Sequence, residues 1–434
     1  MANFIQQCLG ISSEGHLTIG GVDTLELAET FGTPVYIMDE GTIRSRCITY
    51  RDAMREHFGA DALPLYASKA LSFKRMYRIM NEMDMGIDVV SPGEMYTAAK
   101  AGFPLSRAYF HGNNKTDRDI EMARELGIGC FVADNREELE SIERIYGEAG
   151  ETARVMLRVT PGIDPHTFKA VRTGQVDSKF GAAIQTGQAL ELVELALSKK
   201  HIAYVGLHCH IGSQIFDSQP FFDAAKIMTA FIAEILKETG AVTDELNLGG
   251  GFGVRYIETH ESVDYEKNIE KIGKMLRTLC GEYGIKMPRV LMEPGRSIVA
   301  DAGITLYEVG SVKQITGFKN YVSVDGGMPD NPRYALYQSP YDAVVANRAD
   351  AKRNFLCTIA GRCCESGDLI QEDILLQRPE RGDILAVLVT GAYNYSMASN
   401  YNRIPRPPVV MISDGKPYVA VKRESFEDLI RNDV

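Results

Sequence analysis

Short apolar runs alternate with amphipathic stretches through the middle of the chain. Eight of these runs end near the following residues: Tyr66, Val90, Phe110, Val132, Val159, Leu207, Leu248 and Met292. Between them, apolar residues recur at helical spacing over residues 117–126, 187–199, 222–237 and 265–283. Strands that alternate with helices in this number are typical of an α/β fold. They predict a (β/α)8 barrel of the TIM type rather than an open doubly wound sheet.

The two ends of the chain carry a different pattern. Near the N-terminus, strand signals at 17–19 and 34–38 flank a short helix at 24–30, and a longer helix is expected over 42–58. Beyond residue 300 the apolar runs are separated by turns, at 304–312, 321–324, 355–359, 384–389, 409–412 and 417–421, with one helix at 425–431. The sequence therefore predicts two domains, a barrel over residues 40–298 and a β-sandwich or barrel-like domain formed by residues 1–39 plus 299–434.

Composition supports a globular protein that handles small molecules. The 434 residues are 45% hydrophobic and 24% charged, as in ordinary soluble proteins, and the length suits two domains. The net charge of −11 disfavours a surface for nucleic acid or an anionic membrane, because both need an excess of Lys and Arg. We therefore expect no nucleic acid and no membrane as partners, but small molecules or further copies of the same chain.

Targeting and cysteine patterns add two expectations. No apolar run reaches the roughly 18 residues of a membrane span, and the N-terminus lacks a basic region followed by an apolar one, which predicts a cytoplasmic protein. The 8 cysteines include no C-x-x-C pair and no His/Cys cluster with zinc spacing. Neither a disulfide framework nor a bound metal is expected.

Lys69 stands at the end of the first predicted barrel strand. Leu65, Ala67 and Ala70 around it are apolar, which argues that the lysine is buried. Burial would lower the pKa of its ammonium group and free the amine lone pair, as a lysine that forms a Schiff base requires. By itself the segment favours a solvated lysine just past a strand, so the case for a reactive amine depends on residues elsewhere in the chain.

Polar residues also follow the other predicted strands. They are Asp88 and Ser91, His111 and Asn113, Asp134, Arg158, His210 and Ser213, glycines 249–251, and Glu293 with Arg296. The carboxyl ends of the strands of a barrel share one face, where active sites are built. Each residue alone is more simply structural, but a charge at the end of a buried strand is costly unless something pairs with it. The set as a whole predicts an active site on that face.

Three consecutive glycines follow the seventh run. Gly249, Gly250 and Gly251 would let the backbone approach a ligand closely and turn its N–H groups inward, which makes an anion-binding nest. Their spacing is not the G-x-G-x-x-G of a Rossmann fold, and a tight strand-to-helix turn would use the same glycines. Phosphate sites in barrels commonly lie after strands seven and eight, which favours a bound phosphate.

Glu293 and His210 suggest an aromatic cofactor. Glu293 ends an apolar strand and needs a partner, either Arg296 or the protonated nitrogen of a pyridine ring. His210 has a flat ring that can stack on such a cofactor. His208 would point to the opposite side of the strand from His210, so a metal shared by these two histidines is not expected. Together with Lys69 and the glycines, these parts match pyridoxal 5'-phosphate (PLP).

Motifs at the predicted strand ends resemble those of a known family. They lie at residues 66–70, 86–91, 111–115, 178–181, 210–214, 249–251 and 293–296. In content and order the chain resembles the alanine-racemase-fold (fold type III) PLP-dependent decarboxylases over residues 34–407. The resemblance implies that PLP is bound to Lys69 and is surrounded by Asp88, Arg158, His210, Ser213, Gly250, Gly251, Glu293, Gly295, Arg296 and Tyr393.

The C-terminal part resembles one branch of that family. Residues 325–337, 364–368 and 391–402 are similar to those of members that convert meso-2,6-diaminopimelate to L-lysine and CO2, the last step of lysine biosynthesis. A substrate with an amino acid at each end needs cations for one remote group and an acid for the other. The resemblance implies these substrate contacts: Arg296, Arg333 and Tyr337 on the remote carboxylate, Glu365 on the remote ammonium, and Tyr393.

Cys364 takes the role of the catalytic acid in this resemblance. It would return a proton to the α-carbon after CO2 leaves, whereas a free cysteine is more often an inert small hydrophobe. In the related enzymes this cysteine and Glu365 enter the site from a second subunit, which implies a homodimer with active sites shared across the interface. The chain departs from the family pattern at residues 181–182 and 403–407, which leaves only local packing in question.

Three alternatives remain open at this stage. A PLP-dependent decarboxylase of the polyamine pathway, acting on ornithine, arginine or carboxynorspermidine, would keep the cofactor. Ornithine and arginine carry no remote carboxylate, however, and would not need Arg333. A non-catalytic binding protein with the same fold would be expected to lose Lys69 or Cys364, and both are present. A racemase would need an acid-base tyrosine where Cys364 stands.

Overall fold

The computed structural model describes residues 4–163 and 178–434, which divide into two compact units. The barrel unit comprises Arg46–Gly253 and Ser262–Gly295, and the sheet unit comprises Met1–Ser45, Val254–Glu261 and Arg296–Val434. Residues 40–45, 254–261 and 296–298, which the sequence assigned to the barrel domain, thus group with the sheet unit. The division at residues 40 and 298 remains a proposal about domains.

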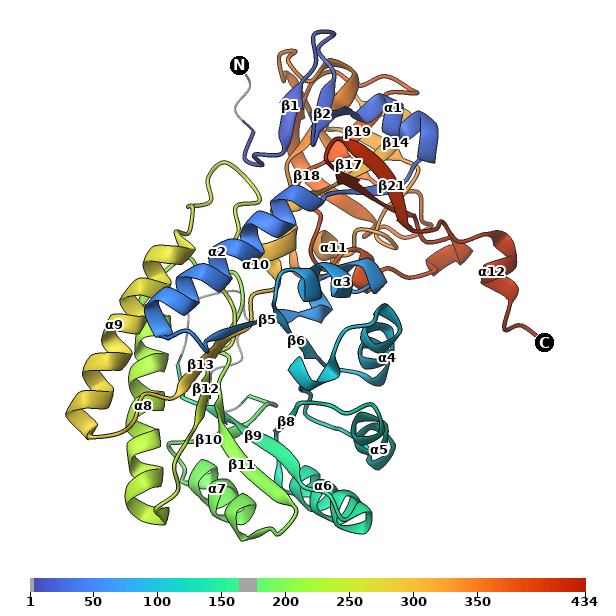
Figure 1. Ribbon diagram of the computed structural model, residues 1–434. Helices are drawn as coiled ribbons and strands as arrows, with labels where there is room; N and C mark the ends of the chain where they lie inside the picture. The colour runs from blue at the N-terminus through green and yellow to red at the C-terminus, as the bar shows by residue number, and fades with distance from the viewer. Residues whose placement is uncertain (1–3, 164–177) are drawn as a thin grey trace. The chain divides into compact units, whose positions relative to one another are not determined.

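Parallel strands close the barrel. Their bounds are β5 Leu63–Ala67, β6 Gly86–Val89, β7 Ala108–Phe110, β8 Cys130–Ala133, β9 Ala153–Thr160, β11 Ile202–His208, β12 Glu245–Asn247 and β13 Arg289–Met292. Each pairs with the next, and β13 pairs back with β5, so the ring has no free edge (Figure 1). A two-residue strand, β10 (Ala182–Ala183), also pairs with the end of β9. The predicted (β/α)8 barrel is confirmed.

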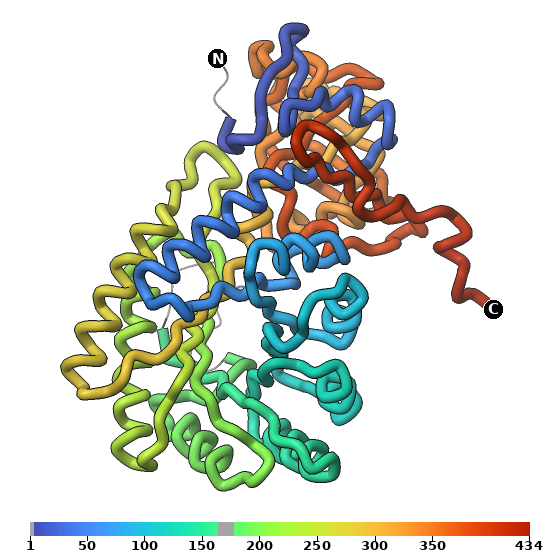
Figure 2. Tube along the Cα trace, viewed as in Figure 1, coloured from blue at the N-terminus to red at the C-terminus, as the bar shows by residue number. Residues whose placement is uncertain are grey.

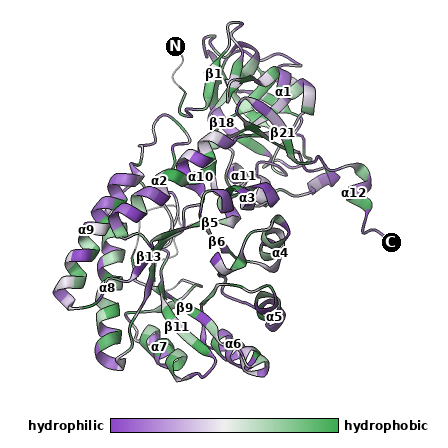
Figure 3. Ribbon diagram, in the orientation of Figure 1, coloured by the Kyte–Doolittle hydropathy of each residue, from purple (hydrophilic) through white to green (hydrophobic). Residues whose placement is uncertain are grey.

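Helices follow the strands and surround the barrel. They are α3 Lys74–Glu82, α4 Pro92–Ala101, α5 Asp117–Glu125, α6 Arg136–Ala149, α7 Gln188–Ser198, α8 Gln219–Thr239 and α9 Tyr265–Tyr283. Figure 3 shows both hydrophilic and hydrophobic colour on these helices, the mixture expected of helices that bury one face. Strands β5 and β8, by contrast, are buried at every residue, because a parallel barrel is covered on both faces.

Capping side chains explain where several helices begin. Thr116 caps α5, Asn135 caps α6 and Asp264 caps α9, each by accepting a hydrogen bond from a backbone N–H in the first turn. Helix α8 begins at Gln219, three residues before the predicted start at 222, because Pro220 suits the first turn of a helix.

The barrel interior is filled by side chains from several strands. The central cluster consists of Leu63, Leu65, Tyr109, Cys130, Val132, Met156 and Leu291. At the amino-terminal end of the strands, buried Glu245 accepts a hydrogen bond from Tyr109 Oη at 2.9 Å. The same carboxylate pairs with Arg154 at 2.8 Å and Arg289 at 3.1 Å. This end of the barrel is therefore closed by a structural ion cluster, which leaves the opposite face for chemistry.

The sheet unit holds a mixed sheet in the order β18-β17-β15-β14-β4-β20-β21, with β19 joining β14 to β16. The bounds are β4 Val35–Asp39, β14 Gly303–Ile315, β15 Lys319–Val324, β16 Ala343–Val345, β17 Phe355–Ala360, β18 Leu369–Leu376, β19 Ile384–Val387, β20 Val409–Ser413 and β21 Lys416–Val421. As expected, a strand from the N-terminal segment, β4, joins this sheet. The predicted β domain accompanying the barrel is therefore confirmed as a separate sheet unit.

Smaller elements complete this unit. They are β1 Leu9–Ile11, β2 Leu17–Ile19, β3 Val22–Asp23, α1 Thr24–Phe31, α10 Arg296–Val299, α11 Arg333–Tyr337 and α12 Phe426–Ile430, while α2 Glu40–Phe58 runs from this unit into the barrel unit. Figure 2 traces the chain from blue near its N-terminus to red at its C-terminus. The first and the last described residues both belong to the sheet unit. Over the described part of the chain, no helix is both long enough and apolar enough to cross a bilayer.

Candidate active site

The carboxyl ends of the barrel strands bring many of the predicted residues to one face. They are Lys69 after β5, Asp88 in β6, Arg158 in β9, His210 and Ser213 after β11, Gly250 and Gly251 after β12, and Glu293 and Gly295 after β13. Because all these strands are parallel, their carboxyl ends meet at the same end of the barrel. The fold thus gathers residues that are more than 200 positions apart in the sequence.

Lys69, the predicted nucleophile, lies in a short 3-10 turn after β5. Its Nζ atom is 3.5 Å from Oδ2 of the buried Asp88. The Lys69 side chain is 42% exposed, so the burial expected from its apolar neighbours is wrong. The reason is local, because Ala67 and Ala70 pack into the core while the 3-10 turn directs the lysine away from it.

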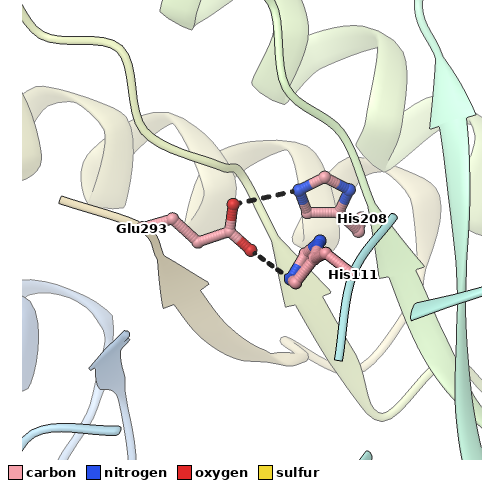
Figure 4. A group of neighbouring side chains, drawn as sticks. All are labelled: His111, His208 and Glu293. Atoms are coloured by element: carbon pink, nitrogen blue, oxygen red, sulfur yellow. Dashed lines mark hydrogen bonds and ion pairs between the residues drawn. The ribbon is translucent and has the colours of Figure 1, made fainter. Parts of the chain in front are cut away.

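Glu293 forms the centre of a buried polar cluster, shown in Figure 4. Its Oε1 atom lies 2.9 Å from Nε2 of His111 and accepts a hydrogen bond from Nδ2 of Asn247 at 2.7 Å. Its Oε2 atom lies 3.2 Å from Nε2 of His208. The carboxylate is therefore held by side chains from the ends of β7, β11 and β12, and Arg296 is not its main partner as one alternative had it.

The protonation states of this cluster follow from burial and close contacts. Burial alone would raise the pKa of the Glu293 carboxyl, but the contacts with His111 and His208 outweigh it and hold that pKa well below its usual value. Burial lowers the pKa of His208 to about 4, against the attraction of Glu293. Burial, followed by the nearby Lys69 ammonium, also holds the pKa of His210 well below its usual value. At neutral pH, Glu293 is ionised and both of these imidazoles are neutral.

Asp88 and Arg158 make separate contacts. Asp88 faces Lys69 through Oδ2, and its Oδ1 atom is 3.8 Å from Nε2 of His111. The guanidinium carbon of Arg158 lies 4.3 Å from the centre of the Phe180 ring. Burial lowers the pKa of Arg158, and the charge of Asp134 is the largest influence against it. Asp88 is therefore the acid beside the predicted nucleophile, while Arg158 lines the same face.

The glycine loop is tightly packed against the neighbouring strand ends. A Cβ atom at Gly250 would lie 2.1 Å from the carbonyl oxygen of Glu293, so no larger residue fits. The N–H of Gly250 donates to Nδ1 of His210 at 3.2 Å, which leaves the ring proton of His210 on Nε2. Gly251 has a φ of +121°, a conformation that side chains disfavour. The loop therefore orients the ring predicted to stack on the cofactor.

A second cluster, in the sheet unit, surrounds the predicted substrate arginines. Nη1 of Arg296 donates to Tyr256 Oη at 2.9 Å, and the guanidinium carbon of Arg333 lies 4.7 Å from the centre of the Tyr256 ring. Arg333 also donates to Tyr341 Oη at 2.8 Å and to Ser339 Oγ at 3.1 Å. Burial would raise the pKa of Tyr256, but the two guanidinium groups outweigh it and lower that pKa.

Arg333 is only 3% exposed, and its described hydrogen bonds go to neutral oxygens. A buried guanidinium held by hydroxyl groups retains its attraction for an anion, which suits a site for a carboxylate. Tyr393 lies over Arg296, 4.7 Å from ring centre to guanidinium carbon, and has a φ of 63°. Tyr337 is half-buried at the end of α11, and in the described residues Tyr341 takes the hydroxyl contact with Arg333.

Cys364 and Glu365 lie on an exposed loop of the sheet unit. The loop is ordered by the buried Asp368, whose carboxylate accepts hydrogen bonds from the N–H groups of Met328 and Cys363, at 2.6 and 2.7 Å. Within the described residues, no recorded contact joins Cys364 or Glu365 to the Arg333 cluster. The structure of one chain thus leaves these two predicted site residues at the surface.

The sequence did not identify several residues of the two clusters. His111 was noted as a polar residue after a strand and as part of a family motif, but not as a contact of Glu293. For His208, only a metal shared with His210 was considered, and it was not expected. Asn247, Tyr256 and Tyr341 were not predicted, because an amide or a phenol in an apolar stretch is usually structural. A polar residue on the last position of a buried strand was the available signal for Asn247.

Comparison with known proteins agrees with this geometry. Residues 40–300 match the family model described as pyridoxal-dependent decarboxylase, pyridoxal binding domain. This range takes in the whole barrel and all the strand ends described above. The chain belongs to the pyridoxal-dependent decarboxylases.

Individual relatives narrow the assignment. The diaminopimelate decarboxylase of Bacillus subtilis (strain 168) is 47% identical over 423 residues, which cover 98% of this chain and 96% of that protein. The diaminopimelate decarboxylase of Staphylococcus aureus (strain COL) is 45% identical, with 97% and 98% covered. The crystal structure of diaminopimelate decarboxylase from M. jannaschii in complex with L-lysine superposes with a TM-score of 0.91, at 34% identity and with 100% and 99% covered. Within its family, the chain is one of the diaminopimelate decarboxylases.

Proposed function

We propose that the chain decarboxylates meso-2,6-diaminopimelate to L-lysine and CO2 with PLP held on Lys69. The observation that carries the proposal is an amine and a buried, ionised carboxylate, Lys69 and Glu293, at the same end of the barrel. The amine suits the aldehyde of the cofactor, and the carboxylate suits its ring nitrogen. The L-lysine in the M. jannaschii relative is the product that this reaction would release.

The residues at the barrel face fit the cofactor. Buried polar atoms there lack a hydrogen-bond partner among the described residues, namely Ser68 Oγ, Asp88 Oδ1, His111 Nε2 and His208 Nδ1. Unpaired buried polar atoms are rare and often mark a ligand site. The backbone at Gly250 packs directly against Glu293, and only glycine allows these two strand ends to come so close on the face where the cofactor would bind.

Each residue is assigned a role toward that group. Lys69 would hold its aldehyde carbon, Glu293 would keep its ring nitrogen protonated, and His210 would stack on the ring. The remaining predicted contacts are Asp88, Arg158, Ser213, Gly250, Gly251, Gly295, Arg296 and Tyr393. When bound, PLP supplies an electron sink for the pair left behind as CO2 departs.

The sheet unit supplies the proposed substrate contacts. Arg333, with Arg296 and Tyr337, would bind the remote carboxylate, and Glu365 the remote ammonium. Cys364 would donate a proton to the α-carbon. Because Cys364 and Glu365 are exposed in a single chain, their proposed roles require a second copy of the chain, in keeping with the homodimer implied by the resemblance.

Replacing Lys69 with Ala tests the function. We expect Lys69→Ala to lose the visible absorbance of the bound cofactor and to form no L-lysine from meso-2,6-diaminopimelate. Lys74→Ala, at an exposed position five residues along, is the matched control and should behave as the wild type. Normal turnover by Lys69→Ala would contradict the proposal, and faster turnover of ornithine or arginine than of diaminopimelate by the wild type would favour the polyamine alternative.

A further inference from the structure

The buried carboxylate of Glu293 is contacted by several polar side chains rather than by a single ion-pair partner. An ionised carboxylate offers about four lone-pair positions. Asn247 occupies one of them at Oε1 and His208 occupies one at Oε2, while His111 Nε2 lies 2.9 Å from Oε1 and takes up the space around that oxygen. One position therefore remains, on Oε2. None of the three groups is a lysine or arginine, although ion pairing with such a cation is the usual way to keep a buried carboxylate charged.

The geometry also fixes the proton of His208. Its Nδ1 atom is buried and has no hydrogen-bond partner in the described part of the chain, whereas Nε2 faces the Glu293 carboxylate at 3.2 Å. The proton of the neutral ring therefore belongs on Nε2, where an acceptor exists. The rings of His111 and His208 meet edge to face, 4.7 Å apart at an angle of 75°, so each ring limits the rotation of the other (Figure 4).

We propose that His208 and His111 are positioning residues, which keep Glu293 ionised and aim the remaining lone pair of Oε2 at the ring nitrogen of the cofactor. This inference rests on the proposed PLP function. Asn247, at the end of β12, donates the third contact to Glu293. The Asn247 side chain is itself fixed, because its Oδ1 atom accepts a hydrogen bond from the N–H of Gly249 at 2.9 Å. The three contacting groups come from the ends of different strands, so the carboxylate is fixed by the barrel itself.

Both negatively and positively charged groups lie near the Glu293 cluster. Asp88 faces His111 at 3.8 Å, and Lys69 faces Asp88 at 3.5 Å. The positive charge of Arg158 also acts on Glu293, as do the buried Cys209 and the half-buried His210. Since these groups stay in place when His208 is replaced, a change at His208 isolates the contribution of one donor to Glu293.

The decisive variant is His208→Phe, which keeps a buried ring and removes the donor. Removal should raise the pKa of Glu293, because a hydrogen bond to its charged form is lost. Activity that needs ionised Glu293 fails as the pH falls through that pKa, so the acid limb of the kcat profile should move to higher pH. At neutral pH we expect kcat to fall about 10- to 100-fold with little change in KM, as for the loss of one hydrogen bond to a charged group.

Two readouts do not depend on turnover. The visible absorbance of the bound cofactor should titrate at higher pH in His208→Phe than in the wild type, and the holoenzyme should release PLP faster on dilution. His208→Gln retains a donor and should recover part of both effects. His201→Phe, a histidine just before the other end of β11 whose ring contacts the carbonyl of Glu151, is the matched control and should resemble the wild type.

Asn247→Asp is a second variant for the same measurement, in case His208→Phe does not fold. It preserves the size of the side chain and its contact with Gly249, but it places a second carboxylate against Glu293. Like charges should move the acid limb to higher pH even further. An acid limb that is unchanged in both His208→Phe and Asn247→Asp would overturn the inference, as would one equivalent of a transition metal bound by these histidines in the purified holoenzyme. A wild-type protein without PLP or lysine formation would instead refute the proposed function.

Discussion

At the scale of single residues, the proposed substrate preference depends on one buried guanidinium. Arg333 is held by Tyr341 and Ser339, and it faces the ring of Tyr256. These neutral neighbours orient the charge without cancelling it, so that an incoming carboxylate gains a strong charge-assisted pair. We therefore expect selectivity for a substrate with a remote carboxylate to depend on Arg333 and the hydroxyl groups around it.

Replacing Arg333 should weaken substrate binding and leave the fold unchanged. We expect Arg333→Met to lower kcat/KM for meso-2,6-diaminopimelate by about 10- to 100-fold, mainly through KM, because a charge-assisted hydrogen bond is lost. Steady-state kinetics measures the effect. Arg378→Met, an exposed arginine over Phe355 in the same unit, is the matched control. An unchanged KM in Arg333→Met would show that the remote carboxylate binds elsewhere.

At the scale of elements, a buried ion pair joins the ends of two barrel strands. Nζ of Lys115, after β7, contacts Glu138 Oε2 at 3.0 Å and the carbonyl oxygen of Val132 in β8 at 2.8 Å. Glu138 also accepts from the N–H of Asp134 at 3.0 Å. Burial lowers the pKa of Lys115, and the attraction of Glu138 opposes that shift. The pair therefore fixes the loop that follows His111.

Breaking this pair should cost stability. We expect Lys115→Met to lower the free energy of unfolding by about 3 to 5 kcal/mol, because Glu138 is left buried without its cation. The double variant Lys115→Met with Glu138→Leu should lose less than the sum of the two single variants. Urea unfolding measures both. The exposed Lys274 of α9 provides the control, since Lys274→Met should leave the unfolding midpoint unchanged.

Two glycines provide a second comparison at this scale. We expect Gly250→Ala to lower the free energy of unfolding by about 1 to 3 kcal/mol, because its Cβ atom would overlap the carbonyl oxygen of Glu293. Gly281→Ala should instead raise it by about 0.5 to 1 kcal/mol, because Gly281 lies inside α9 and its Cβ atom would meet nothing within 4 Å. Thermal unfolding distinguishes the two, and equal effects would contradict this account of the glycine loop.

For the whole molecule, the exposed Cys364 and Glu365 make assembly part of the proposed activity. We expect the protein to sediment as a homodimer. We also expect Lys69→Ala and Cys364→Ala subunits, each inactive alone, to regain part of the activity when they are mixed and allowed to exchange. Recovery requires that one active site draws Lys69 and Cys364 from different chains. A monomer with full activity, or no recovery in mixed dimers that are shown to form, would contradict shared sites.

Much of the fold could be predicted from the pattern of apolar residues. Strand β13 ends at Met292 as expected, and β12 ends one residue before the expected Leu248. Strand β18 was missed because Gln371, Glu372 and Asp373 interrupt its apolar pattern, and only pairing with β17 makes that stretch a strand. Strand β16 was missed because three residues are too few to show a period.

Less of the site could be predicted without family resemblance. Lys69 and Glu293 stand at strand ends, where a barrel carries its chemistry, so their position alone was informative. The exposure of Lys69 could not be predicted in this way, because apolar neighbours in sequence do not determine which way a side chain leaves a turn. The role of His208 was missed because alternation along one strand relates it to His210 and says nothing about a carboxylate on another strand.

The sequence by itself determined the barrel, the accompanying β domain and the list of reactive side chains, because these depend on periodicity and on residue types near strand ends. Only the tertiary structure decided which of those side chains meet. His111, His208 and Asn247 converge on Glu293 from the ends of strands that are distant in sequence, and Tyr256 reaches Arg333 from a segment that is likewise distant. The physical reason is that hydrogen bonds and charge pairs act over a few ångströms, so they form between residues that the closed fold brings together and not between neighbours in the sequence.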